Sequence, residues 1–194
     1  MMWIRKAETE DLAAAEKIYA AARTFMRQNG NPDQWGGGYP QPALLRDDLE
    51  KGQLYVCVGD FCMGNLPKTA EFAAAAADHM PGKNGKSAGQ ILAVFVFFEG
   101  EEPNYRIIEN GAWQNNEPYG VVHRIAVSDA ARGCGAAAFC LNWAKAQTKN
   151  LRIDTHTNNL PMQRLIEKCG FCRSGIIRVE DGSPRIAYMK TAEA

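Results

Sequence analysis

The sequence lacks a net charge, a long apolar run and any regular pairing of cysteines with histidines. Its 22 basic and 22 acidic residues cancel, which removes the electrostatic basis for nucleic acid or an anionic membrane as the main partner. No segment approaches the roughly 18 apolar residues of a membrane span, and the N-terminus lacks the apolar stretch of a signal peptide. We therefore expect a cytoplasmic protein that acts neither on nucleic acid nor in a membrane.

The six cysteines show no pattern typical of a metal site or a disulfide framework. Cys169 and Cys172 form a C-x-x-C sequence, but it lies across the expected end of a helix and has no second pair. We expect no bound metal, and reduced thiols that pack as small hydrophobic residues.

The length of 194 residues and the 46% hydrophobic content fit a single domain over residues 1–194. Apolar spacing and turn signals predict a helix that starts at a Thr9 cap and ends by residue 29, and further helices over 43–51, 135–147 and after Asn159. Strands are expected at 3–5, 54–58, 91–98, 119–127, 151–155, 175–179 and 185–189.

A long connection over residues 60–89 separates two of these strands and is interpreted as an insertion, with a helix predicted for its Ala-rich part, 71–79. The early hairpins imply antiparallel pairs, and the strand–helix–strand unit over 119–155 implies a parallel pair. The expected fold is therefore an α/β (α+β) mixed sheet with helices on both faces.

The segment 123–144 carries the clearest chemical signal. A strand expected to end at Val127 is followed by Arg132-Gly133-Cys134-Gly135 and directly by a helix. The first amides of a helix have no partner within it, and the helix dipole adds positive charge there. Because glycine and alanine leave the backbone accessible, and Arg132 adds a charge, the segment predicts a pyrophosphate site.

A dinucleotide is one ligand for such a site. Gly133, Gly135 and Ala138 satisfy the loose G-x-G-x-x-A pattern, and Asp154 follows about 20 residues later, where a ribose-binding acid belongs. However, residues 128–132 separate the turn from its strand, and only one further helix follows. We therefore keep a nicotinamide enzyme as a weak alternative.

Two motifs resemble those of the GNAT N-acetyltransferase superfamily. Residues 132–137 are similar to its R/Q-x-x-G-x-G/A pyrophosphate motif, and Asn159 followed by Gly170-Phe171 is similar to its second signature. The loop WGGGYPQP and the run EPYGVVHRIAV resemble an uncharacterised bacterial branch of these enzymes. The resemblance implies a mostly antiparallel sheet of six to seven strands whose one parallel pair splays apart.

The resemblance also implies transfer of an acetyl group from the cosubstrate acetyl-CoA to a primary amine of a small molecule or peptide. The amine attacks directly, and a backbone N–H near Ile125 supports the oxyanion. Asn159 would hold the pantetheine or order the strand bulge, or act as a plain helix cap. Many relatives pair, so a homodimer is compatible. The main chain that would contact the cofactor is that of Ile125, Ala126, Val127, Arg132, Gly133, Cys134, Gly135, Ala136 and Ala137.

Many relatives carry a tyrosine where this chain has Ile166, and that tyrosine protonates the leaving thiolate. Tyr188 and Tyr119 are candidate replacements, unless they are only sheet aromatics. The missing tyrosine also favours an alternative function, a non-catalytic acyl-CoA-binding sensor or structural module.

His123 is the leading candidate for a catalytic base, because its ordinary pKa suits proton transfer near neutrality. Regular strand alternation would place it on the same side as Ile125 and Val127, although a structural histidine remains the alternative. His156 and Glu109 are secondary candidates. Cys134 is interpreted as a spacer, because direct transfer needs no thiol nucleophile. Aromatic residues of the loop 35–39 and Trp113 either wall the acceptor pocket or plug the core.

Overall fold

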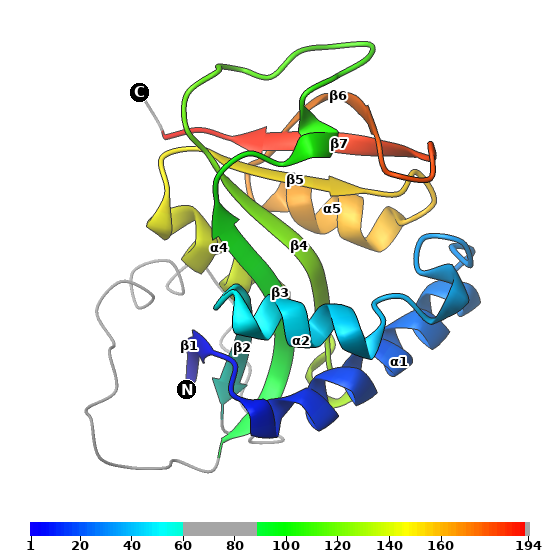
Figure 1. Cartoon of the computed structure of the whole chain (residues 1–194), viewed down its shortest axis with the longest axis vertical. Coiled ribbons are helices and arrows are strands. Elements are labelled where there is room, and N and C mark those ends of the chain that lie inside the picture. The colour runs from blue at the N-terminus through cyan, green and yellow to red at the C-terminus, as the bar shows by residue number, and fades with distance from the viewer. Residues whose placement is uncertain (60–88, 193–194) are drawn as a thin grey trace.

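A computed structural model describes residues 1–59 and 89–192 (Figure 1). Within these residues one sheet of seven strands has the order β1-β2-β3-β4-β5-β7-β6. The pair β4–β5 is parallel and the other neighbours are antiparallel, which confirms the predicted mixed sheet. The strands are β1 Met2–Lys6, β2 Leu54–Gly59, β3 Gln90–Glu99, β4 Gly120–Val127, β5 Leu151–Thr155, β6 Cys172–Arg178 and β7 Pro184–Lys190.

Helices cover both faces of the sheet, as predicted. Helices α1 (Leu12–Gln28) and α2 (Pro42–Glu50) lie on one face, and α4 (Ala136–Gln147) and α5 (Leu160–Lys168) on the other (Figure 1). Thr9 does not cap α1; it begins a 3-10 turn, and the carboxylate of Asp11 accepts a hydrogen bond from the Glu8 amide at 2.7 Å. The helix predicted over 71–79 and the insertion over 60–89 lie almost entirely outside the described residues.

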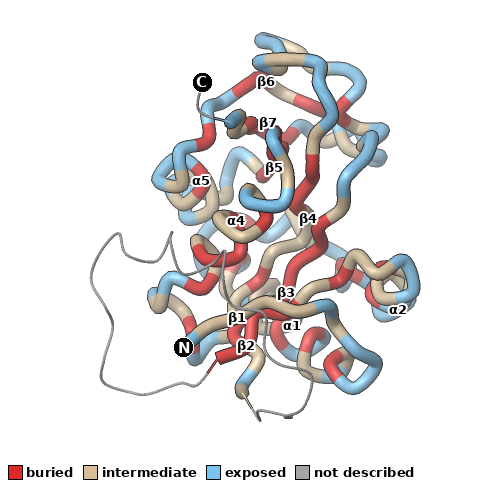
Figure 2. The backbone as a smooth tube through the Cα atoms, turned by 90° about the vertical axis from the view of Figure 1, so that its left-hand side faces the viewer, coloured by how far each residue is buried: buried red, intermediate tan, exposed pale blue. Residues whose placement is uncertain are grey.

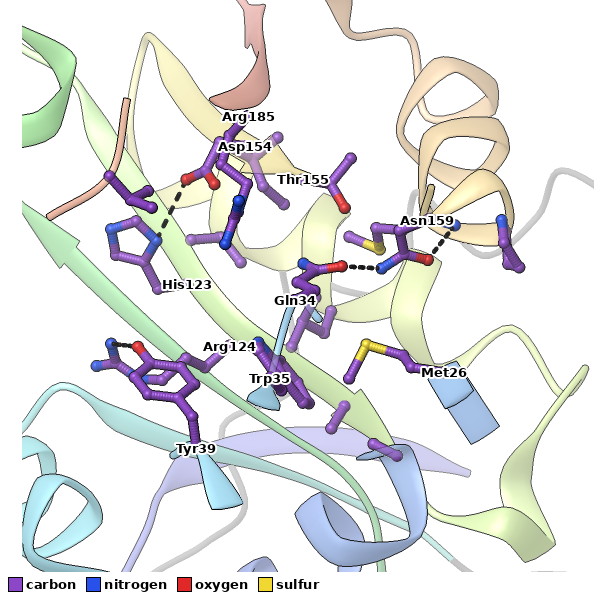
Figure 3. A pocket seen from close by; sticks show the side chains of 18 of the residues that line it. Met26, Gln34, Trp35, Tyr39, His123, Arg124, Asp154, Thr155, Asn159 and Arg185 are labelled. Carbon is purple, nitrogen blue, oxygen red and sulfur yellow. Dashed lines mark hydrogen bonds and ion pairs between the residues drawn. The ribbon is translucent and has the colours of Figure 1, made fainter. Parts of the chain in front are cut away.

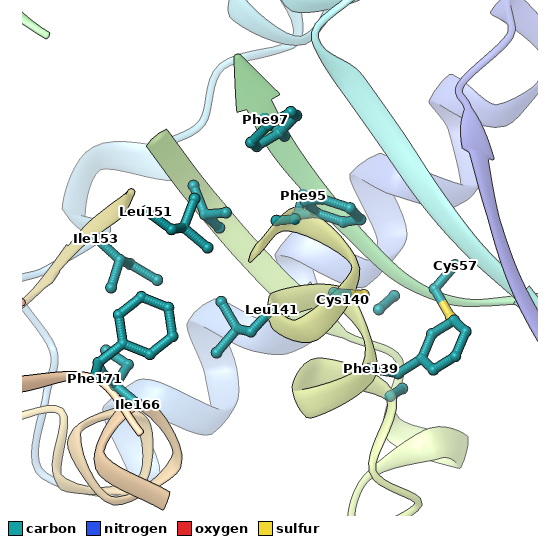
Figure 4. Close-up of a cluster of buried hydrophobic side chains, with 14 of the residues drawn as sticks. Cys57, Phe95, Phe97, Phe139, Cys140, Leu141, Leu151, Ile153, Ile166 and Phe171 are labelled. Atoms are coloured by element: carbon teal, nitrogen blue, oxygen red, sulfur yellow. The ribbon is translucent and has the colours of Figure 1, made fainter. Parts of the chain in front are cut away.

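Buried residues run along the central strands of the sheet (Figure 2). Their side chains form one large hydrophobic cluster on each face and a smaller cluster around Tyr105 and Val121. Under α4 and α5, Phe95 and Ile153 of the sheet pack with Leu141 and Ile166 of the helices (Figure 4). Under α1 and α2, Val56 and Val94 pack with Ile18 and Leu45. Burial of about 1.5–3 kcal/mol per large apolar side chain is the main force that holds the helices to the sheet.

Strands β4 and β5 pair only over Gly120–Val122 and Leu151–Ile153, and then diverge. This confirms the predicted splay of the parallel pair. It also rules against the dinucleotide alternative, because a doubly wound nucleotide-binding sheet needs several parallel strands. Beyond Val122, the edge of β4 that faces β5 pairs with no other strand of the described residues.

A bulge interrupts β4 beside the point of divergence. Val94 pairs with Ala126 and Val96 with His123, so Arg124 and Ile125 together lie opposite one residue of β3. Arg124 adopts the left-handed conformation, with φ 52°, which is uncommon for a residue other than glycine. The extra residue shifts the alternation of side chains. Ile125 and Val127 pack on the α4 face, whereas His123 contacts Phe98 and Tyr105 on the opposite face.

The prediction that His123 shares a face with Ile125 and Val127 is therefore wrong, and the bulge is the reason. Of the cysteines in the described residues, Cys57 and Cys140 are buried, as predicted for small hydrophobic residues, whereas Cys172 is exposed, and none is joined in a disulfide. In the ranges 1–59 and 89–192, no helix has both the length and the apolar character to cross a bilayer. No group of His, Cys, Asp or Glu side chains in those ranges could hold a metal ion.

Candidate active site

A cleft of about 980 Å³ opens where β4 and β5 diverge. Its walls are residues 122–127 of β4, residues 153–155 of β5 and parts of α1 and α5. Arg132 and Ala137, at the start of α4, line one end. His123, Asp154 and Arg185 lie together at the other end, across the cleft from Tyr39 (Figure 3).

The start of α4 presents a group of backbone N–H donors. The amides of Gly133 and of residues 135–138 donate to no acceptor in the described part of the chain; these five are called the α4 amide cluster. Gly133 and Gly135 have φ of 79° and 82°, and a Cβ on either would meet nothing within 4 Å. Gly133 and Gly135 are exposed, Ala137 lines the cleft and Ala136 is buried, and the helix dipole favours an anion at this helix start.

The cluster differs from the predicted set at three positions. The amides of Arg132 and Cys134 donate to the carbonyls of Asp129 and Ala131, at 3.4 and 3.2 Å. The Ala138 amide, which the motif did not suggest, belongs to the cluster. Arg132 still lines the cleft, where its guanidinium lies 4.0 Å from the centre of the Phe25 ring.

Asn159 begins α5 and lines the same cleft. Its side-chain oxygen accepts from the Met162 amide at 3.3 Å, and its NH₂ group donates to Gln34 at 2.8 Å (Figure 3). The helix-cap interpretation is therefore confirmed. Gln34 follows α1, so this contact joins the two sides of the cleft.

His123 lies between two carboxylates. Its Nε2 is 3.0 Å from Oε2 of Glu102, and its Nδ1 is 3.7 Å from Oδ1 of Asp154. Tyr105, which is buried, donates its hydroxyl to the same Asp154 oxygen at 2.7 Å. The imidazole side chain is 20% exposed, so it is held firmly but remains reachable from the cleft.

The ionisation of this group is set by burial and hydrogen bonds. Burial opposes the charge on Glu102, but hydrogen bonds from His123 and Asn104 outweigh it and hold the pKa of Glu102 below its usual value. Burial, with Asp154 nearby, raises the pKa of Tyr105 well above its ordinary value. Glu102 is therefore an anion at neutral pH, and Tyr105 is a neutral donor.

Glu102 and Asp154 were not predicted as partners of His123. Glu102 lies in the loop after β3, and Asp154 on β5, so only tertiary contacts bring them to His123. The one sequence signal was Asp154 itself, an acidic residue near the end of β5, which the dinucleotide pattern had explained differently.

Tyr188 does not line the cleft. It is 1% exposed and packs in the core under α4 and α5, and its hydroxyl is 3.4 Å from Glu167. Tyr119 is also outside the cleft; its hydroxyl accepts from the Glu102 amide at 3.2 Å. The hydroxyl groups that do line the cleft are those of Tyr39 and Thr155. Thr155 is buried and its hydroxyl has no partner within the described chain.

The secondary candidates also lie elsewhere. His156 accepts from the Asn158 amide at 3.1 Å, and burial, with Arg185 nearby, lowers its pKa. Glu109 forms an ion pair with Arg178 at 2.8 Å, away from the cleft. Of the predicted aromatic wall, Trp35 and Tyr39 line the cleft, whereas Trp113 packs against Arg152.

Comparison with known proteins gives a consistent result. Residues 69–171, more than half of the chain, match the model of the acetyltransferase (GNAT) family. A GNAT-family acetyltransferase from Streptococcus agalactiae 2603 is 27% identical, with a TM-score of 0.79 over 100% of this chain and 96% of that one. No protein of curated function matches by sequence.

More distant structures share the fold. A GNAT-family acetyltransferase from Listeria monocytogenes 4b F2365 is 15% identical, with a TM-score of 0.63, covering 98% of this chain and 94% of that one. A chain of the NatC complex bound to Gag peptide and CoA is 14% identical, with a TM-score of 0.58 over 99% of each chain. With the splayed parallel pair and the α4 amide cluster, the family match gives one conclusion: the chain belongs to the GNAT acetyltransferase family.

Proposed function

We propose that this acetyltransferase is a single-domain N-acetyltransferase that transfers an acetyl group from acetyl-CoA directly to a primary amine of a small molecule or peptide. The observation that carries the proposal is one continuous cleft with Arg132 and Ala137, at the start of α4, at one end and His123, between two carboxylates, at the other. We expect it to act in the cytoplasm, where its free thiols stay reduced.

The chain has suitable groups for the pyrophosphate and the pantetheine of the cosubstrate. The α4 amide cluster would donate to the pyrophosphate. The main chain of Ile125, Ala126 and Val127 would pair with the pantetheine, because this edge of β4 has lost its β5 partner. Acetyl-CoA supplies the acetyl group as a thioester. Asn159 would contact the pantetheine while it caps α5.

His123 is assigned the role of general base. Glu102 lies within hydrogen-bonding distance of Nε2, which favours the tautomer with its proton there and leaves Nδ1 to accept the proton of the amine. Asp154, at 3.7 Å from Nδ1, would stabilise the imidazolium that forms. As the amine nitrogen bonds to the carbonyl carbon, an N–H in the bulge near Ile125 would donate to the carbonyl oxygen. The C–S bond then breaks and the leaving thiolate takes a proton. The candidate donors are the hydroxyl groups of Tyr39 and Thr155, which line the cleft.

The decisive experiment measures CoA thiol release from acetyl-CoA with a panel of amines. His123→Gln should lower kcat by about 10²- to 10⁴-fold, the usual contribution of a general base, while the Kd for CoA stays within about twofold because His123 is remote from the amide cluster.

His156→Gln is the matched control, since His156 does not line the cleft, and it should leave kcat unchanged. Tight binding of acetyl-CoA without thiol release for any amine would overturn catalysis and favour the sensor. Equal losses in both histidine variants would overturn the role of His123.

A further inference from the structure

Arg185, at the start of β7, is a nearly buried cation that lines the cleft. It is 8% exposed and lies at the same end as His123 and Asp154 (Figure 3). A buried guanidinium is costly unless a carboxylate, an aromatic face or a full set of acceptors compensates its charge.

The other enclosed arginines are compensated in this way. Arg152 is 4% exposed and lies between the rings of Trp113 and Tyr119, at 4.1 and 3.7 Å. Arg124 pairs with Asp48 at 2.6 Å. Each has a stabilising partner supplied by the fold.

Arg185 has no such partner. A single nitrogen of its guanidinium, Nη1, donates to Ser183 Oγ at 2.9 Å and to the Pro184 carbonyl at 3.1 Å. In the described ranges, Nε and Nη2 have no acceptor, no carboxylate lies within 4.0 Å, and no ring lies under the guanidinium. Part of its donor set is therefore available to a ligand in the cleft.

The acids that line the cleft do not fill this role, because none of Asp33, Glu102, Asp154, Glu180 and Asp181 forms an ion pair with Arg185. Asp181 lines the cleft, but its carboxylate accepts from the Ser183 amide at 2.9 Å and from the Ser183 hydroxyl, which holds it in the β6–β7 turn. Asp154 accepts from Tyr105 and faces His123. Asp154 and Arg185 thus present opposite charges to one end of the cleft without forming an ion pair.

From this arrangement we propose that the acceptor is an amine that carries a free carboxylate, namely an α-amino acid in its zwitterionic form. Its carboxylate binds the free edge of the Arg185 guanidinium, a geometry in which arginine makes two parallel hydrogen bonds. Its ammonium group lies against Asp154 and gives its proton to His123. This inference rests on the proposed function and narrows its substrate class.

The first test needs no variant. Thiol release is measured with a panel of α-amino acids, each paired with its carboxamide, and with spermidine as a polycation without a carboxylate. We expect kcat/KM to be about 10- to 100-fold higher for the carboxylate of the best pair, the range of a charge-assisted contact. A carboxamide as good as its acid, or a clear preference for spermidine, would overturn the proposal.

The second test removes the guanidinium. Arg185→Met keeps the length of the side chain and should abolish the preference for the acid, while the rate with the carboxamide changes little. Arg185→Lys should keep part of the preference. Arg173→Met, at an exposed position outside the cleft, is the control and should keep all of it. A parallel fall with both ligands would mean that Arg185 is only structural.

Binding separates this proposal from the proposed function. The amino acid that gives the best rate, or each member of the panel if none reacts, is titrated calorimetrically into the wild-type protein and into Arg185→Met, both with saturating CoA. Binding that depends on Arg185 without turnover would contradict the catalytic proposal and support the amino acid site. Turnover of amines that lack a carboxylate, with no binding of amino acids, would do the reverse.

Discussion

Replacement of Gly135 by glutamate tests the proposed contact between the α4 amide cluster and the pyrophosphate of acetyl-CoA. Gly135 has φ 82°, where a side chain costs about 1–2 kcal/mol. Since a Cβ would meet nothing within 4 Å, no clash adds to this strain. For a chain of this size the loss corresponds to a fall in Tm of about 2–8 °C, which leaves the protein folded.

The effect on binding should be much larger than the effect on stability. A hydrogen bond to a charged group is worth about 1.5–3 kcal/mol. If the glutamate side chain and its charge keep the pyrophosphate from even two amides of the α4 cluster, the loss is about 3–6 kcal/mol. The Kd for CoA should then rise by about 10²- to 10⁴-fold.

Calorimetric titration of CoA gives the Kd, and thermal melting gives the stability. Gly30→Glu is the matched control, because Gly30 has φ 77°, equally open surroundings and no place in the cleft. It should show the same fall in Tm and normal binding. Wild-type affinity in Gly135→Glu, or equal loss of affinity in both variants, would refute the assignment of the α4 amide cluster.

Two further predictions concern the catalytic end. Because the pKa of Glu102 is lowered, its carboxylate contributes stability above the unfolded-state pKa, and this is lost as pH falls through the lowered folded-state value. The free energy of unfolding of the wild type should therefore exceed that of Glu102→Gln by about 1 kcal/mol near pH 7. The two free energies should become equal below about pH 4, as measured by denaturant unfolding. Tyr188→Phe should leave kcat within about twofold of wild type, because its hydroxyl lies outside the cleft; a loss of 10²-fold or more in thiol release would show that the hydroxyl reaches the reacting atoms after all.

The parts of this protein that the sequence predicted are those that depend on neighbours along the chain. The helix start at α4 is predicted by Gly133, Gly135 and the alanines that follow, since only glycine adopts positive φ without strain. Asn159 and Gly170 mark the two ends of α5 for similar reasons. Apolar periodicity then predicted most of the strands and helices.

The surroundings of His123 could not be predicted in the same way. Glu102, His123, Asp154 and Arg185 come from different elements, and no local pattern links them. The side chain of Arg124, the residue at the bulge, is held by hydrogen bonds to Asp48 and Tyr39, which lie far away in the sequence. Without that knowledge, regular alternation gave His123 the wrong face.

The bulge in β4 divides one strand between two tasks. Before it, the strand directs side chains such as His123 to the face that carries α1 and α2. After it, the strand offers the unpaired main chain of residues 125–127 to the opening beside β5. A regularly pleated strand that kept Ile125 and Val127 on the α4 face would turn His123 into the apolar layer beneath α4, so one additional residue determines which face of the sheet carries the imidazole.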